Sequence, residues 1–323
     1  VVNGIWTGSV AHDPCRARIL TGTSSPANPD LAAIVGHSHG GGLPLGSLDL
    51  SGWSLAGPLA ASTGRVGARS QLKTLVDPTA NLPAPPGAPW TYPLFAPGPQ
   101  DQSAIDAWRA QRHSRAAVRD LGRNAALFHD VEEASARARA LRESTAGVFD
   151  VLPLGQDADL TTQLDVAVEL LRRDVCRAVT VDSGSKWDTH ADNTQQHAMH
   201  NHLFAALDGL VAALYEADLL DTTTVAVLSE MSRTPTLNQA GGKDHWGHTS
   251  ALLVGGRLLG GRTLGATDDR QTSQPVDLRS GQPSDSGLLL KYDNLAAGLL
   301  SAVDVDPGRW LPGVEPLDAL TVG

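Results

Sequence analysis

Side chains of the types that bind metal ions gather in one part of the chain. They are Asp188, His190, Glu230, Asp244 and His245. Carboxylate oxygens and imidazole nitrogens are the donors that hold a divalent cation at neutral pH. We therefore predict that this part of the chain builds a site for one or two divalent cations, among which Ca²⁺, Zn²⁺, Mg²⁺ and Mn²⁺ stay open.

Two strand-like segments position these side chains. Residues Arg177–Val181 and Thr223–Leu228 are rich in Val, Thr and Ala, and polar residues follow each of them. Ligands of an open α/β sheet gather at the carboxyl ends of its strands, because loops can converge there without interrupting the hydrogen-bond ladder. Asp188 and His190 follow the first segment and Glu230 follows the second, so we expect these loops to meet.

A structural role is the alternative for the first pair. Asp188 would then cap the following helix, and His190 would pack against Trp187. We favour the metal interpretation because Glu230 and His245 come at equivalent strand exits.

Helical patterns surround these loops. Residues Asn193–Glu216 carry leucines at three- and four-residue spacing, which predicts a helix with one apolar face: Leu203, Leu207, Leu210 and Leu214. The segments Gln102–Glu143, Leu160–Arg173 and Asp293–Asp306 are also predicted to be helical. The alternating charges of the first of these predict a solvated face.

The segment HDPCRARILTG, from His12 to Gly22, predicts a turn followed by a short helix over Arg16–Leu20. A helix start that carries an arginine favours negative charge, since backbone N–H groups and the guanidinium group both attract anions. His12 could act there as a base, a metal ligand or a nucleophile. The alternative is a capping turn in which Arg16 pairs with a neighbouring carboxylate.

This segment resembles a motif of the sulfatases in the alkaline-phosphatase superfamily, Cys-x-Pro-Ser-Arg followed by Thr-Gly at the head of a helix. The matching residues are Pro14, Arg16, Thr21 and Gly22. His12 stands where that family has its modified nucleophilic cysteine, and Cys15 stands where it has serine.

Later motifs extend the resemblance. Glu230 stands where sulfatases have a metal-binding Asp, whereas Met231 cannot supply the oxygen of the Asn that follows it there. The loop GGKDHWGHTS resembles the superfamily's late His-bearing loop. Together WDTH, SEMSRTP and DHW resemble an uncharacterised family of bacterial sulfatase-like proteins, which often carry twin-arginine export signals; the resemblance runs from about Asn3 to Pro312.

The resemblance implies an α/β fold with a central mixed β-sheet flanked by helices on both faces, in one domain over residues 1–323. It implies a metal-dependent hydrolase of a sulfate, phosphate or related ester, acting on a small anionic ester or glycan in the periplasm or outside the cell. Arg16 would neutralise charge on the transferred group, and His12 would act near the nucleophile position. Superfamily members carry metal-binding Asp residues on an earlier first strand, which we expect this chain to lack.

Two other functions stay open. The residues at His12 and Met231 motivate a catalytically degenerate member that binds an anionic ligand, a glycan or a protein partner. The segment Gly36–Gly40 fits the G-x-S-x-G motif of serine hydrolases, with Ser38 as nucleophile. That motif requires a helix directly after the serine, whereas glycines and Pro44 follow here, so we interpret the segment as a flexible glycine loop.

The composition limits the number of domains and the classes of partner that we expect. The 323 residues suffice for a full core in one large or two modest domains, and Ala, Gly, Leu and Val supply it, as in a helix-rich α/β enzyme. With 25 basic and 35 acidic residues, neither nucleic acid nor an anionic membrane is the expected partner. No apolar run is long enough to cross a bilayer. Cys15 and Cys176 form no disulfide framework. The proline-rich residues 81–100 predict a surface excursion.

Overall fold

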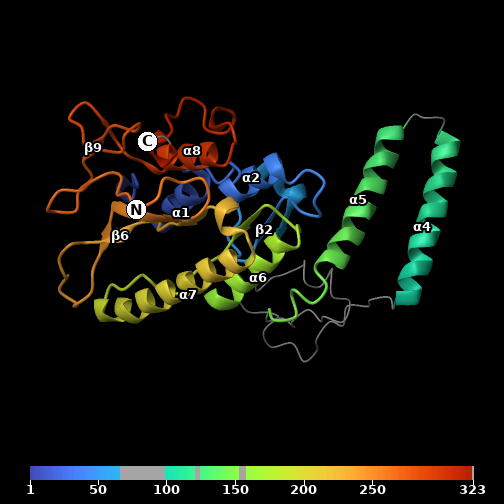
Figure 1. The fold of residues 1–323 in the computed structure, drawn as a ribbon, viewed down its shortest axis with the longest axis horizontal. Coiled ribbons are helices and arrows are strands. Elements are labelled where there is room, and N and C mark those ends of the chain that lie inside the picture. The colour runs from blue at the N-terminus through green and yellow to red at the C-terminus, as the bar shows by residue number, and fades with distance from the viewer. Residues whose placement is uncertain (66–98, 121–123, 153–157, 322–323) are drawn as a thin grey trace.

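The computed structural model describes residues 1–65, 99–120, 124–152 and 158–321, and they form a mixed α/β fold (Figure 1). The α/β class is thus confirmed. The described strands form several small sheets. One antiparallel sheet has the order β1-β8-β5, from Val2–Trp6, His248–Val254 and Val225–Val227. One parallel sheet has the order β3-β2-β4, from Thr63–Arg65, Ser47–Asp49 and Ala178–Thr180.

The two strands predicted to carry the site are β4 and β5. Each is shorter than the predicted segment, and each leads into the expected loop. Two further pairs of short strands complete the described sheets: β6 (Ser232–Arg233) with β7 (His245–Trp246), and β9 (Pro275–Val276) with β10 (Leu288–Leu289).

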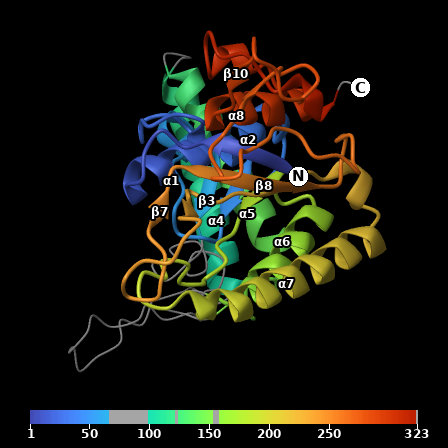
Figure 2. The same cartoon turned by 90° about the vertical axis from the view of Figure 1, so that its left-hand side faces the viewer.

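Helices lie on both sides of the strands in Figure 2. On one side are α1 (His12–Thr21), α2 (Leu31–His39) and α8 (Tyr292–Ala302). On the other side are α6 (Leu160–Arg172) and α7 (Gln196–Glu216). Most side chains of α8 are buried, and several of them pack in one core cluster with side chains of β1 and β8.

The predicted leucine face of α7 packs mainly against α6. Leu210 and Leu214 are buried against Leu160 and Leu164 of α6. Val181, directly after β4, and Val225 of β5 pack against the same cluster. The helix pair therefore supports the strands that lead to both halves of the site. The predicted start at Asn193 is a 3-10 turn (Asn193–Gln195) that precedes the α-helix.

The segment Gln102–Glu143, predicted as helical throughout, is two helices. These are α4 (Pro99–Asp120) and α5 (Ala125–Ser144), which run antiparallel and stand apart from the rest of the molecule in Figure 1. Most of their described side chains are exposed, as the charge pattern predicted. Below α5, Val148, Phe149 and Leu152 are buried and attach the hairpin to the core around β2.

The glycine-loop interpretation of Gly36–Gly40 was wrong, because Leu31–His39 forms α2 and Gly40 is its C-cap. A Cβ atom on Gly36 would lie 2.4 Å from the carbonyl carbon of Gly46, so this glycine allows α2 to approach the chain before β2. Ser38 is exposed in the last turn of the helix, whereas a nucleophile elbow needs its serine between a strand and a helix.

Further expectations concern the surface of the chain and its domain organisation. The proline-rich segment lies outside the described residues, apart from the two that begin α4. The single domain stays a prediction, and β1 directly precedes α1. Among the described helices, none is both long and apolar enough to cross a membrane.

Candidate metal centre

The structure brings together six of the seven candidate residues. His12 is the first residue of α1, and the others follow β4, follow β5 or adjoin β7: Asp188, His190, Glu230, Asp244 and His245. The seventh candidate, Arg16, points elsewhere. Loops that are far apart in the sequence thus meet where the strand-exit argument expected them.

Three histidine rings converge on the carboxylate of Asp188. The Nε2 atom of His245 lies 2.9 Å from Oδ1 of Asp188, and Nε2 of His190 lies 3.0 Å from the same oxygen. Nε2 of His12 lies 3.6 Å from the other carboxylate oxygen, Oδ2. The Nε2 atoms of His190 and His245 are 3.1 Å apart.

Each ring is also held through its Nδ1 atom. Nδ1 of His12 lies 2.6 Å from Oε1 of Glu230, Nδ1 of His190 lies 3.1 Å from Oδ1 of Asp244, and Nδ1 of His245 lies 2.7 Å from the carbonyl oxygen of Val10. These partners are acceptors, so each Nδ1 donates its hydrogen. A neutral ring then has its lone pair on Nε2, facing Asp188, and that arrangement is repulsive unless positive charge lies between the groups.

Arg233 supplies part of this positive charge. Its guanidinium group donates to Oδ1 of Asp188 and lies 3.4 Å from Nε2 of His190. Burial raises the pKa of Asp188, but the contacts with Arg233 and His245 lower it by more, so the net pKa is well below its ordinary value. Asp188 is therefore an anion at neutral pH. Arg233 was not predicted from the sequence, where its only signal was its place in SEMSRTP.

The geometry fits a divalent cation. Among the described residues, one ligand atom each of His12, Asp188 and His245 lies within 4.8 Å of the other two. Two imidazole nitrogens and one carboxylate oxygen are a donor set used by catalytic metal sites that keep a position open for water or substrate. His190 is adjacent as a further donor.

Two of the predicted ligands each contact a histidine of the cluster instead. Glu230 contacts Nδ1 of His12, and Asp244 contacts Nδ1 of His190, so both reach the centre through a histidine. Carboxylates in this position fix the tautomer and orientation of a metal-binding ring. A hydrogen bond from Asn238 and a second from His190 lower the pKa of Asp244. Oε2 of Glu230 is buried and has no hydrogen-bond partner among the described residues.

The structural alternative for Asp188 and His190 was wrong. Asp192 caps the following 3-10 turn by accepting from the backbone of Thr194. The ring of Trp187 packs edge-on against His200. Asp188 and His190 are thus left to the histidine cluster.

Arg16 does not reach the cluster that was predicted to include it. Its guanidinium carbon lies 3.9 Å from the centroid of the Trp53 ring, and its ion pair with Asp13 is 3.9 Å long. The expected pairing with a neighbouring carboxylate is therefore present but at the limit of an ion pair.

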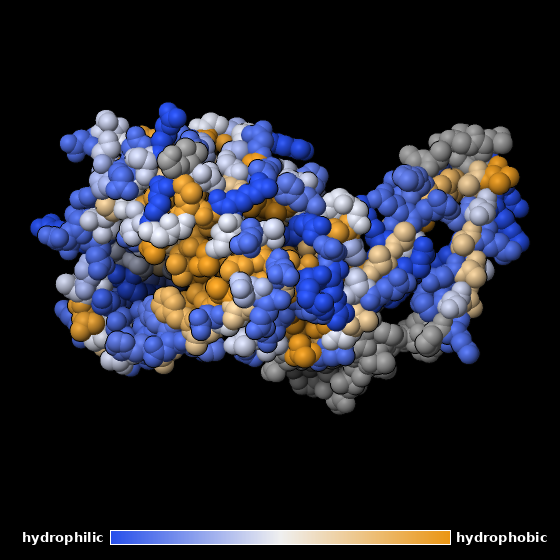
Figure 3. All heavy atoms as spheres, viewed as in Figure 1, coloured by the Kyte–Doolittle hydropathy of each residue, from blue (hydrophilic) through white to orange (hydrophobic). Residues whose placement is uncertain are grey.

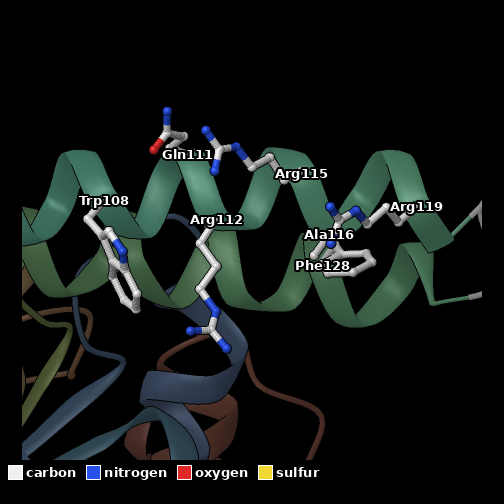
Figure 4. A pocket seen from close by; sticks show the side chains of 7 residues that line it. All are labelled: Trp108, Gln111, Arg112, Arg115, Ala116, Arg119 and Phe128. Atoms are coloured by element: carbon white, nitrogen blue, oxygen red, sulfur yellow. The ribbon is translucent and has the colours of Figure 1, made fainter.

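A hollow of about 620 Å³ lies elsewhere, between α4 and α5 (Figure 4). Arginine and aromatic side chains line much of it: Trp108, Arg112, Arg115, Arg119 and Phe128. It shares no residue with the histidine cluster.

Comparison with known proteins places the chain in one family. Residues 1–280 match the family model DUF1501, whose description is a protein of unknown function, and the chain belongs to that family. No curated protein and no solved structure matches it. The function must therefore be inferred from the site itself.

Proposed function

We propose that this member of the DUF1501 family is a metal-dependent hydrolase of a sulfate, phosphate or related ester. One observation carries the proposal: three Nε2 atoms face the Asp188 carboxylate while each Nδ1 is already bonded. A divalent cation would satisfy these lone pairs together. His12, Asp188 and His245 would hold it, with His190 beside them, and it would polarise an ester oxygen or lower the pKa of a bound water.

In this proposal Glu230, Asp244 and Arg233 have different roles around the cation. Glu230 and Asp244 keep two rings in the tautomer that binds a cation. Arg233 is only 12% exposed in its side chain and also donates to the carbonyl oxygen of Lys243, so its guanidinium group is fixed beside Asp188. There it would stabilise negative charge that develops on a transferred sulfate or phosphate group. Arg16, which the resemblance places in this role, lies at Trp53 instead.

We also propose that the two three-stranded sheets belong to one central sheet of the alkaline-phosphatase type. In the described part of the chain, β4 pairs with β2 and β5 pairs with β8, so each keeps one open edge. Val181 and Val225 pack on the same α6–α7 cluster. An apolar area lies above α7 on the face seen in Figure 3. A strand paired with the open edges of both β4 and β5 would join the two sheets beside Asp188.

The test combines metal analysis with an ester panel. Protein purified without chelator is analysed for bound metals and assayed on aryl sulfates, phosphate monoesters and phosphate diesters. We expect a stoichiometric divalent metal and turnover of at least one ester class, lost with EDTA and restored by one added metal. Turnover that is insensitive to metal removal, or absent with every metal, would contradict the proposal.

A second candidate is binding without turnover, directed at an anionic ligand, a glycan or a protein partner. It is favoured by the contact of Arg233 with Asp188, because a guanidinium group already neutralises that carboxylate. Protein that binds no divalent metal in equilibrium dialysis would support this candidate. Stoichiometric metal would favour the hydrolase.

A further inference from the structure

We propose that Arg16 and Trp53 form a subsite that binds an acidic sugar unit beside the metal centre. The inference rests on the proposed function, since it assigns the substrate of that centre to acidic glycans and their esters. Its geometry, however, is independent of any metal.

The pair presents two free surfaces. The guanidinium carbon of Arg16 lies 3.9 Å from the centroid of the Trp53 ring, which covers one face of the indole. Trp53 is nevertheless 49% exposed, so about half of its surface remains accessible to a ligand. The Arg16 side chain is 31% exposed, and Asp13, at 3.9 Å, is its ion-pair partner among the described residues. The outer N–H groups of the guanidinium thus remain available.

The loop that carries Trp53 is fixed by buried carboxylates. Asp49 accepts hydrogen bonds from the backbone and the hydroxyl group of Ser51, at 2.9 and 2.5 Å. Asp30 accepts from Ser54 and from the backbone of Leu55, at 3.1 and 2.8 Å. Asp49 and Asp30 are 1% and 3% exposed. Buried anions that hold a surface loop in one conformation reduce the entropy lost when the loop binds a ligand.

The subsite lies beside the metal centre. Arg16 comes four residues after His12 on α1, which is about one turn, or about 6 Å along the helix axis. The loop with Trp53 leaves the carboxyl end of β2, and the loop with Asp188 leaves the carboxyl end of β4, its parallel neighbour. The helix spacing and the strand exits therefore both place Arg16 and Trp53 on the same side of the sheet as the histidine cluster.

The two surfaces favour an acidic sugar over simpler ligands. The open face of an indole is apolar and suits the C–H face of a sugar ring. The planar guanidinium fork suits a carboxylate, which it can bind through two parallel hydrogen bonds. A neutral sugar would use the first surface alone, and an inorganic anion would use the second alone. A uronate uses both at once.

The test follows the indole N–H signal of Trp53 by NMR in the full chain without added metal, with the signal assigned through the Trp53→Phe variant. The protein is titrated with D-glucuronate, D-glucose and sodium sulfate at constant ionic strength. We expect glucuronate to shift this signal saturably and to bind at least about tenfold more tightly than glucose or sulfate. Equal binding of sulfate would indicate an anion site only, and no glucuronate shift would overturn the subsite.

Two variants and a matched control separate the contributions. Arg16→Lys keeps the charge but loses the fork, and Trp53→Ala removes the platform, so each should weaken glucuronate binding at least about tenfold. Trp6→Phe is the control, because Trp6 is also partly exposed and has Lys291 over its ring at 5.5 Å. It should leave the affinity unchanged. Loss of affinity in the control to the same extent would overturn the assignment.

The inference can fail separately from the proposed function. The titration is run without added metal and measures no turnover, so glucuronate binding at Trp53 would stand even if no ester were hydrolysed. Conversely, metal-dependent ester hydrolysis without a glucuronate shift would retain the hydrolase and reject the subsite.

Discussion

The Nε2 atom of His245 lies 2.9 Å from Oδ1 of Asp188, although 57 residues separate the two in the chain. The opposite nitrogen of the ring is already bonded to the carbonyl oxygen of Val10. The contact therefore needs a proton on Nε2 or a cation nearby. His190 meets the same carboxylate oxygen at 3.0 Å, which increases the need for positive charge. This relationship determines the first two predictions.

Replacing Asp188 with Asn should remove most of the cation affinity. The amide keeps the size of the side chain but loses the negative charge on which three rings converge. We expect Zn²⁺ or Mn²⁺ affinity in calorimetric titration to fall by more than about 100-fold, beyond the range for residues that only support a ligand. The matched control is Asp192→Asn, which alters a nearby half-buried cap and should bind as the parent does. Equal affinities for parent and Asp188→Asn would exclude this metal site.

Replacing Glu230 with Gln should have a smaller effect on the same titration. Glu230 holds Nδ1 of His12 at 2.6 Å and so keeps the lone pair of His12 on Nε2. We expect a loss of about 10- to 100-fold in metal affinity, the range for carboxylates that orient a metal-binding histidine. Nitrogen-15 NMR of the His12 ring gives a second readout, because the parent should show hydrogen on Nδ1. A variant with parental affinity and an unchanged tautomer would assign Glu230 a purely structural role.

The sequence predicted those residues of the histidine cluster that lie in loops after a strand. Asp188 and His190 lie in the loop that leaves β4, and Glu230 lies in the loop that leaves β5, so local patterns were enough to expect them together. Arg233 could not be found this way. It reaches Asp188 because β6 pairs with β7, which places Arg233 opposite His245, and such long-range pairing leaves no local pattern. The same limit explains why Glu230 was predicted as a ligand when it holds His12.

The loop prediction for Gly36–Gly40 failed because a glycine there allows close packing between two segments of the chain. Gly40, the glycines that follow it and Pro44 predicted a loop, because these residues are unfavourable at the start of a helix. In the structure Gly36 lies inside α2 and permits close contact with Gly46. This benefit arises between segments, so a local propensity argument cannot detect it.

Replacing Gly36 with Ala should therefore destabilise the protein. The added Cβ atom would lie 2.4 Å from the Gly46 carbonyl carbon, so backbone must move. We expect a loss of about 1–3 kcal/mol in the free energy of unfolding, as for other overpacked sites, measured by urea denaturation. Gly41→Ala is the control, because a Cβ atom added to Gly41 would meet nothing within 4 Å among the described residues. Equal stability of the two variants would refute the close approach of α2.

Ser38 should be chemically unreactive. It is exposed at the end of α2 and lacks the strand-to-helix turn that activates a hydrolase serine. We expect a fluorophosphonate probe to leave Ser38 unlabelled in mass spectrometry, and Ser38→Ala to retain parental turnover of any ester that the panel identifies. Stoichiometric labelling of Ser38 would revive the serine hydrolase.

The last prediction concerns the pH dependence of stability at the end of α6. Glu169 accepts hydrogen bonds from Arg172, at 2.8 Å, and from Arg173, which also donates to the backbone carbonyl of Ala146 below α5. The bond from Arg172, opposed by burial and reinforced by Arg173, lowers the pKa of Glu169 from 4.5 to about 2. Because the folded pKa lies below the unfolded one, the ionised group stabilises the fold above pH 4.5, and this contribution disappears as the pH falls towards 2.

Glu169→Gln should accordingly lower the free energy of unfolding at pH 7 by about 1 kcal/mol, the upper end for ion pairs that water can reach. The difference from the parent should shrink between pH 4.5 and 2, since protonation removes the same charge from the parent. Urea denaturation across this pH range measures it, with Glu143→Gln as the control at an exposed position on α5. A difference that stays constant down to pH 2 would show that Glu169 acts through its shape or its packing, because a contribution from the ionised carboxylate must vanish when the carboxylate is protonated.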